Sequence, residues 1–381
     1  MAIAIISSPN TVQPAFNQMV FDVSSTNAGQ ANFNFLCDVY NGSALVSRLQ
    51  FPKQPSVNTC KIDISQVIKN YVTHDLSNVY TTICADNTNS RSKYYCQFGE
   101  VYDVSGIPTT YANLTRNPTS GSKQGVNSVF DFEDFTANIM AAYDVSGFGF
   151  LTEIPETIKI KSGQQLYLTF YDPLGVVTDV EYIVGPGGSD AIAGTSNEFL
   201  RNLNGGWWAL QHFSLQSYAV SNYAIRLLKT GGGTVRTLTV NIDNECSKFD
   251  TYRLHWLNHL GGWDAYNFTK STIQRVQIER KQFKKIQSLS YSIGDRLKTN
   301  YNTTLVDEIT INSDWMSDTM AAWIEGLFTS PLVFLERPNG DMIAVNITDS
   351  IFEVKKYLNG RTLHNVSLTF EYSYNRYRQS L

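Results

Sequence analysis

Residues 246–268 read CSKFDTYRLHWLNHLGGWDAYNF and place aromatic side chains, two histidines and a Gly-Gly pair in one short segment. Tyr252, Leu254 and Trp256 alternate with polar residues, which predicts a strand with these side chains on one face. Residues 258–262 predict a tight turn, because glycine adopts positive φ without steric cost. The residues after the turn predict a second strand. One of two alternating sets shares its face: Trp263, Ala265 and Asn267, or Asp264, Tyr266 and Phe268.

The pattern Tyr-Arg-Leu-x-Trp-Leu-Asn-x-x-Gly-Gly-x-Asp-x-Tyr-x-Phe in this segment resembles virion structural proteins of bacteriophages and prophages that infect Bacteroidota. The residues of this family motif are Tyr252, Trp256, Leu257, Asn258, Gly261, Gly262, Trp263, Tyr266 and Phe268. Further segments fit the same resemblance: Ile154-Pro155 before a strand expected at 164–171, FTSPLV at 328–333, and LTFEYS at 368–373. The resemblance implies a component of a virus particle rather than an enzyme, and it leaves the choice between head and tail open.

The composition predicts a mainly β protein. The chain has 381 residues, of which 42% are apolar and 13% aromatic, enough for more than one hydrophobic core. Charged residues make up only 17%, below the quarter that is usual, while Ser, Thr, Asn, Tyr and Phe are abundant. We expect two or three antiparallel β-sandwich-like domains followed by a C-terminal α+β unit, a helix on a sheet. The net charge of −4 argues against nucleic-acid binding by the chain as a whole.

Hydrophobic periodicity and turn signals divide the chain into four parts. Residues 64–71 have the spacing of a two-turn helix at the end of the first part, and TGGG at 230–233 predicts a hairpin in the third. The expected parts are an N-terminal β-sandwich over 1–105, a linker or extended loop region over 106–149, a central β domain with the motif over 150–290, and a C-terminal α+β domain over 291–381.

One longer helix is expected in the last part of the chain. It follows an Asn-Ser-Asp start at 312–314, and Ser330-Pro331 ends it. The apolar residues that recur at helical spacing are Trp315, Met316, Met320, Trp323, Ile324, Leu327 and Phe328.

Residues 269–286 alternate apolar and basic side chains. The apolar residues are Ile273, Val276, Ile278 and Phe283, and the basic ones are Arg275, Arg280, Lys281, Lys284 and Lys285. A strand with one solvated face is favoured, since charge runs usually coat surfaces. A basic strand that faces DNA is the alternative.

The cysteines and the hydropathy of the chain indicate the cellular compartment in which the protein is made. The five cysteines are widely spaced without a C-x-x-C pair, which indicates buried free thiols rather than a zinc site or a disulfide framework. The N-terminus lacks the pattern of a signal peptide, and no stretch reaches the roughly 18 apolar residues of a membrane span. We therefore expect synthesis in a bacterial cytoplasm, incorporation into the virion, and no membrane partner.

The motif contains one metal-binding alternative. His255 and His259 are four residues apart, which on a helix would place both imidazoles on one face with Asp264 as a third ligand. The surrounding aromatics and the Gly-Gly pair favour a strand and a structural role for the imidazoles. We expect no metal and no cofactor.

Catalytic patterns are absent from the sequence. It contains no GxxxxGK[ST], GxSxG or HExxH motif. Glycoside hydrolysis and calcium binding both need carboxylates, but the spacing of the candidate carboxylates indicates neither function. The candidates are Asp131, Glu133 and Asp134, and Asp307 and Glu308.

These observations predict a non-enzymatic structural subunit of a phage virion, a ring, hub or baseplate-type component of the tail or neck. Its partners would be further copies of itself and other virion proteins. Trp207 and Trp208 are candidate contacts, either between subunits or with a sugar ring. The alternatives are a carbohydrate-binding host-recognition protein or a head-decoration protein of the same particle, and a glycosidase or lyase.

Overall fold

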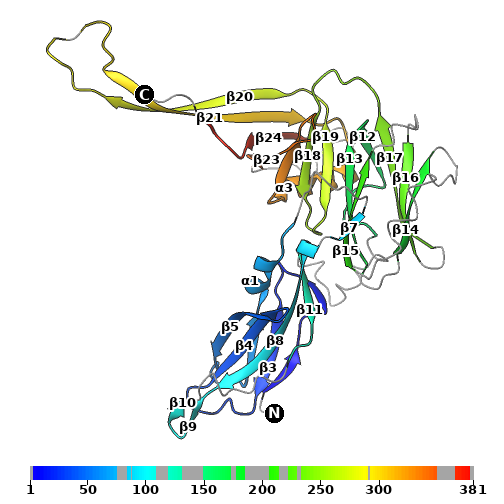
Figure 1. Cartoon of the computed structure of the whole chain (residues 1–381), viewed down its shortest axis with the longest axis vertical. Coiled ribbons are helices and arrows are strands. Elements are labelled where there is room, and N and C mark those ends of the chain that lie inside the picture. The colour runs from blue at the N-terminus through cyan, green and yellow to red at the C-terminus, as the bar shows by residue number, and fades with distance from the viewer. Residues whose placement is uncertain are drawn as a thin grey trace, which may run out of the picture.

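The computed structural model describes residues 3–74, 84–86, 88–108, 119–130, 149–172, 177–184, 206–213, 222–229, 233–290, 292–349 and 365–377. Over these residues the protein is mainly β and multi-domain, with six sheets and only short helices. An N-terminal domain lies at one end of the long axis, a larger body lies at the other, and a long hairpin projects sideways from the body (Figure 1). The expected fold class is confirmed.

The N-terminal domain is a sandwich of a three-stranded and a five-stranded sheet, ordered β1-β3-β6 and β2-β11-β8-β4-β5. The rings of Phe21 on β3 and Phe98 on β8 lie 5.1 Å apart, so the two sheets share one core. A hairpin of two-residue strands, β9 (Asp103–Val104) and β10 (Ile107–Pro108), follows. The sandwich strands are β1 (Ile3–Ser7), β2 (Val12–Pro14), β3 (Val20–Ser25), β4 (Asn34–Asn41), β5 (Ala44–Pro52), β6 (Thr59–Asp63), β8 (Arg91–Val101) and β11 (Lys123–Val126).

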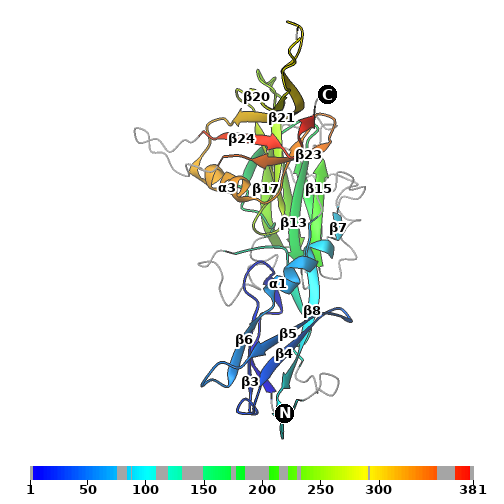
Figure 2. The same ribbon diagram turned by 90° about the vertical axis from the view of Figure 1, so that its left-hand side faces the viewer.

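The helix expected at 64–71 is present as α1 (Ser65–Ile68), which continues into the 3-10 helix η1 (Lys69–Tyr71). Ile64 and Ile68 are fully buried in the sandwich core. The helix lies at the end of the N-terminal domain that faces the body (Figure 2).

The boundary expected at residue 105 is wrong. β11 falls inside the segment expected to be a linker, yet it pairs antiparallel with β8 and parallel with β2. A Cβ on Gly125 would lie 2.5 Å from the Ile68 side chain, so this strand packs directly against the helix. Four residues with a central glycine show no apolar periodicity, so a sequence pattern does not predict this strand. Residues 109–118 and 131–148 of the expected linker lie outside the described residues.

The body contains a four-stranded sheet, a three-stranded sheet and an eight-stranded sheet. The four-stranded sheet has the order β12 (Thr157–Lys161), β17 (Gly233–Asp243), β16 (Asn222–Lys229), β14 (Val177–Val184). The three-stranded sheet has the order β13 (Gln165–Asp172), β15 (Gly206–Phe213), β7 (Cys84–Asp86), and the 3-10 helix η2 (Thr88–Ser90) follows β7 in the chain. Pairing of Lys229 with Gly233 confirms the hairpin expected around 230–233.

The eight-stranded sheet joins the motif to the end of the chain. Its order is β19 (Trp263–Phe268), β18 (Tyr252–Leu257), β22 (Val333–Glu336), β23 (Met342–Ile347), β24 (Ser367–Tyr372), β21 (Lys298–Asn312), β20 (Ile273–Lys284), and β25 (Arg376–Tyr377) also pairs with β21. One hydrophobic core contains side chains of this sheet and of the other two body sheets. The boundary expected at residue 290 is therefore wrong, because the central part and the C-terminal part share both a sheet and a core.

A helix packs on this sheet as expected, although it starts later. α3 spans Asp318–Thr329, and the hydroxyl of Ser317 accepts a hydrogen bond from the Met320 backbone N–H as its N-cap. The Trp323 ring lies 5.0 Å from the Trp256 ring of β18. Trp315 precedes the helix and is 64% exposed, so its assignment to the helical face was wrong. Neither described α-helix has the length and hydropathy needed to cross a bilayer.

The cysteines follow the expectation only in part. Cys37 and Cys96 are buried free thiols on neighbouring strands, and Cys60 is half-buried. The expectation is wrong for Cys246, which is exposed in the segment before β18. The side chain of Cys84 lies outside the described residues.

Candidate interaction site

The family motif forms an antiparallel hairpin of β18 and β19. Leu254 and Trp256 are fully buried in the body core, which confirms the face expected for the first strand. Of the two sets open for the second strand, the one ending in Phe268 shares this face, because directly opposed residues lie on one side of a sheet. The opposed pairs are Tyr252 with Phe268, Leu254 with Tyr266, and Trp256 with Asp264. Leu257 opposes Trp263 on the other face, and both pack against Tyr167.

The turn of the hairpin is held by the side chain of Asn258. Its Nδ2 donates to the Leu151 carbonyl at 2.9 Å, and its Oδ1 accepts from the Gly262 backbone N–H at 2.9 Å. Gly261 has a φ of +87°, the left-handed region that favours glycine. The motif residues Asn, Gly and Gly therefore close the turn and attach it to the loop before β12.

Gly262→Ala is expected to lower the free energy of unfolding by about 1–3 kcal/mol, the usual cost of overpacking. A Cβ at this position would lie 2.6 Å from the Leu151 carbonyl oxygen and 3.2 Å from the Asn258 amide. Chemical denaturation followed by circular dichroism measures the change. Gly29→Ala is the control, because a Cβ there meets nothing within 4 Å. Equal stability of the two variants would show that the turn is not closely packed.

Asp264 joins three parts of the body. It is buried, and its carboxylate accepts hydrogen bonds from Thr152 Oγ1 at 2.5 Å and from Trp323 Nε1 at 2.9 Å. Burial raises the pKa of Asp264 to about 6, although the Thr152 and Trp323 hydrogen bonds oppose the increase. The carboxylate links the motif hairpin to α3 and to the loop before β12, which is a structural role.

His255 lies on the opposite face of the hairpin from Asp264. It is fully buried, and its Nε2 lies 2.7 Å from Glu336 Oε2 on β22. Burial lowers the pKa of His255 to about 4, and the nearby Arg253 charge acts in the same direction, against the Glu336 hydrogen bond. His259, in the turn, lies 3.7 Å from Glu153 Oε1. The fold thus separates the three residues considered as metal ligands, and the described residues contain no cluster of metal-binding side chains.

The other sequence candidates are not brought together. Asp307 forms an ion pair with Arg376, whereas Glu308 lies opposite Glu371 of β24. The carboxylates at 131, 133 and 134 lie outside the described residues. Trp207 and Trp208 belong to β15, where their backbones pair with Tyr171 and Phe170 of β13. Their side chains lie outside the described part of the structure, so the contact expected there remains a prediction.

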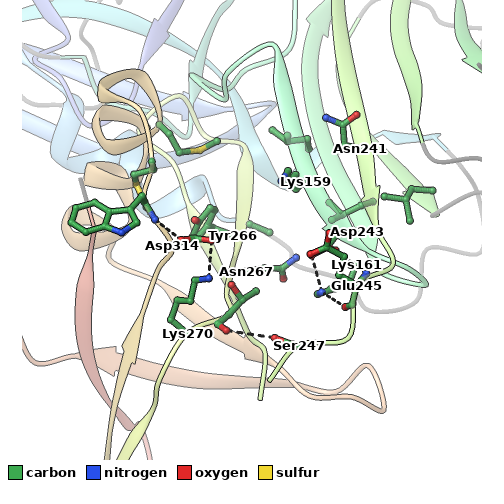
Figure 3. Close-up of a pocket in the computed structure, with 18 of the residues that line it drawn as sticks. Lys159, Lys161, Asn241, Asp243, Glu245, Ser247, Tyr266, Asn267, Lys270 and Asp314 are labelled. Carbon is green, nitrogen blue, oxygen red and sulfur yellow. Dashed lines mark hydrogen bonds and ion pairs between the residues drawn. The ribbon is translucent and has the colours of Figure 1, made fainter. Parts of the chain in front are cut away.

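An open groove of about 1040 Å³ lies where the ends of β12 and β17 approach β19 and the start of α3 (Figure 3). We call it the lateral groove. Two ion pairs belong to the polar part of its lining. Lys161 lies 2.7 Å from Asp243, and Lys270 lies 2.9 Å from Asp314. Its apolar lining includes Ile160, Tyr266, Met316 and Met320, together with the exposed aromatics Phe249 and Trp315.

Residues 273–290 and 292–301 form an arm that projects from the body (Figure 1). Among the described strands, its outer strand, β20, pairs only with β21, and all twelve residues of β20 are exposed. The apolar side chains Ile273, Val276, Ile278 and Phe283 are therefore exposed together with the basic ones. The expectation of one solvated face is wrong, since both faces of the strand meet solvent.

The comparisons with known proteins do not identify a family. No family model matches the chain, and no curated protein matches its sequence. A chimeric titin Z1Z2-Z1Z2 tandem with a GRGDS peptide from fibronectin has 10% identity, covering 63% of this chain and 99% of its own, with a TM-score of 0.17. The chicken CNTN1 FN1–FN3 domains have 7% identity, covering 81% and 91%, with a TM-score of 0.19. Similarities this low carry no argument about this protein.

Proposed function

We propose that the protein is a non-enzymatic structural subunit of a bacteriophage virion, a ring, hub or baseplate-type component of the tail or neck that assembles with itself and with other virion proteins. The observation that carries this proposal is the arm. A two-stranded hairpin without a packed face is marginally stable in water, and exposed apolar patches mark interaction surfaces. The arm therefore has the properties of a segment that is covered in an assembly.

Two further features support a mechanical role. The hairpin that resembles virion proteins is built into the body core, where its aromatic residues hold sheet and helix together. His255 and Asp264, which are two of the buried titratable groups of the motif hairpin, are engaged in contacts that join elements of the fold. The motif thus serves as a rigid platform from which the arm projects.

Particle composition tests the proposal directly. Mass spectrometry of density-purified particles from a lysate of the strain that encodes this chain is expected to recover it in a constant ratio to the other virion proteins. Immunogold labelling is expected to place it on the tail or neck. The control is an equal amount of lysate taken before particle assembly and purified in the same way. It shows how much unassembled protein contaminates the particle fraction. Absence of the chain from purified particles would contradict the proposal.

A further inference from the structure

We infer that the arm of one subunit docks on the body of a second copy of this chain, with its apolar tip in the lateral groove. This inference rests on the proposed self-assembly and specifies the two surfaces that meet. The side chains at the tip are Ile286, Leu289 and Ile293, and all three are fully exposed.

None of the residues that the structure describes covers the tip of the arm. Every described residue from 273 to 296 is exposed, and Figure 1 shows the tip pointing away from the body. Strands rise about 3.3 Å per residue, so the twelve residues of β20 reach about 40 Å, far enough to meet a neighbouring subunit. The partner of the tip is therefore a different molecule.

Charge favours a second copy as that partner. Residues 273–301 contain seven basic and two acidic side chains, a net charge of +5 on a chain whose total is −4. Residues 1–130 contain eight basic and seven acidic side chains, a net charge of +1, so the rest of the chain carries −10. A basic arm is attracted to an acidic body, and such complementarity steers association. The acidic excess lies outside the lateral groove, whose lining has four lysines and three carboxylates, so charge acts on the approach of the arm and the apolar side chains act at the contact itself. DNA would also attract the arm, but phosphate contacts leave the three aliphatic tip side chains uncovered.

The lateral groove has the chemistry to receive the tip. It exposes Trp315 and Phe249 beside an apolar lining, and buried aromatics are typical anchors of interfaces. Its volume of about 1040 Å³ is slightly above the range, about 300–1,000 Å³, of cavities that enclose small ligands. Lys270, which lines the groove, precedes β20 by only three residues, so the groove lies at the root of the arm.

Tip and groove are different surfaces at opposite ends of the arm. Contact between them is therefore heterologous, head to tail, and repeated contacts of this kind close into a ring or extend into a filament. A head-to-tail contact can also be recognised by mixing two variants, one with an altered tip and one with an altered groove. Each variant retains one intact surface, so the two variants can bind each other.

Two full-length variants test the contact. The tip variant carries Ile286→Ser, Leu289→Ser and Ile293→Ser, and the groove variant carries Trp315→Ala and Phe249→Ala. All five side chains are exposed in the single chain, so both variants should fold, and circular dichroism checks this. A matched control removes three exposed aliphatic side chains of the N-terminal domain: Ile6→Ser, Val104→Ser and Ile107→Ser.

Sedimentation velocity is expected to show assembly of the wild type and of the control. Each test variant alone should remain monomeric, with self-association at least tenfold weaker. An equimolar mixture of tip and groove variants should form one-to-one dimers and nothing larger, because only one tip and one groove remain intact in each pair.

Other outcomes would overturn the inference. Wild-type assembly of the groove variant would exclude the groove as the acceptor and would indicate arm-to-arm pairing. A mixture that stays monomeric would exclude a contact between tip and groove. A wild-type protein that is monomeric, but binds duplex DNA through the arm or host polysaccharide through the groove, would exclude a second copy as the partner. The proposed function is judged separately, by the composition of the particle.

Discussion

Trp256→Ala is expected to lower the free energy of unfolding by about 3–5 kcal/mol, the range for removal of a fully buried aromatic side chain. Trp256 has no exposed surface and is among the largest fully buried side chains of the protein. It packs against Trp323 of α3, and a Cβ on Gly326 would lie only 3.3 Å from its indole nitrogen. The alanine variant would therefore leave a cavity between the motif hairpin and the helix, where the backbone approaches closely.

Denaturant unfolding at neutral pH measures this loss. Trp315→Ala removes the same atoms from a side chain that is 64% exposed, and the expected change is within about 0.5 kcal/mol. The comparison separates the role of a core tryptophan from that of an exposed one. A Trp256→Ala variant that loses less than about 1 kcal/mol would show that the hairpin and α3 do not share a rigid core.

Asp264→Asn and His255→Gln are expected to change the pH dependence of stability in opposite directions. Burial raises the pKa of Asp264 from 3.8 to about 6, so its stabilising contribution is complete below pH 3.8 and is lost as the pH rises through 6. Burial lowers the pKa of His255 from 6.5 to about 4, so its contribution is complete above pH 6.5 and is lost as the pH falls through 4. Each shift corresponds to about 3 kcal/mol, and the two nearly cancel between pH 4 and 6 in the wild type.

Denaturant unfolding at several pH values between 4 and 7 measures these slopes. Without the Asp264 carboxyl, stability should fall by about 3 kcal/mol as the pH decreases from 6.5 to 4. Without the imidazole, stability should instead fall by a similar amount as the pH increases from 4 to 6, and glutamine retains a donor for Glu336. If both variants follow the wild-type profile, the two groups are not buried as the structure places them.

Local sequence patterns predicted the parts of the fold that local interactions determine. Alternation from Tyr252 to Trp256 and the Asn and glycines of the turn predicted the motif hairpin, and helical spacing predicted α3. Strand pairing between distant segments could not be predicted in this way. β11 joins the N-terminal sandwich, and β24 lies in the same sheet as β18, because of contacts that no short window of sequence contains.

The candidate site was less predictable than the fold. Alternating apolar and basic residues in 273–284 predicted a strand, but the pattern does not reveal whether a core covers the apolar face. The lateral groove combines residues as distant as Ile160, Phe249 and Trp315. The available signal was the density of lysine and arginine among aliphatic residues in 273–298, which is unusual for a strand buried on either face.

The most direct measurement of the central claim is electron cryo-microscopy of the purified full-length protein, after sedimentation velocity has established its mass. We expect a closed ring of fixed copy number, with the arm of each subunit lying on its neighbour and the tip side chains covered. A protein that remains monomeric at every concentration tested, with its arm exposed, would contradict self-assembly through the arm.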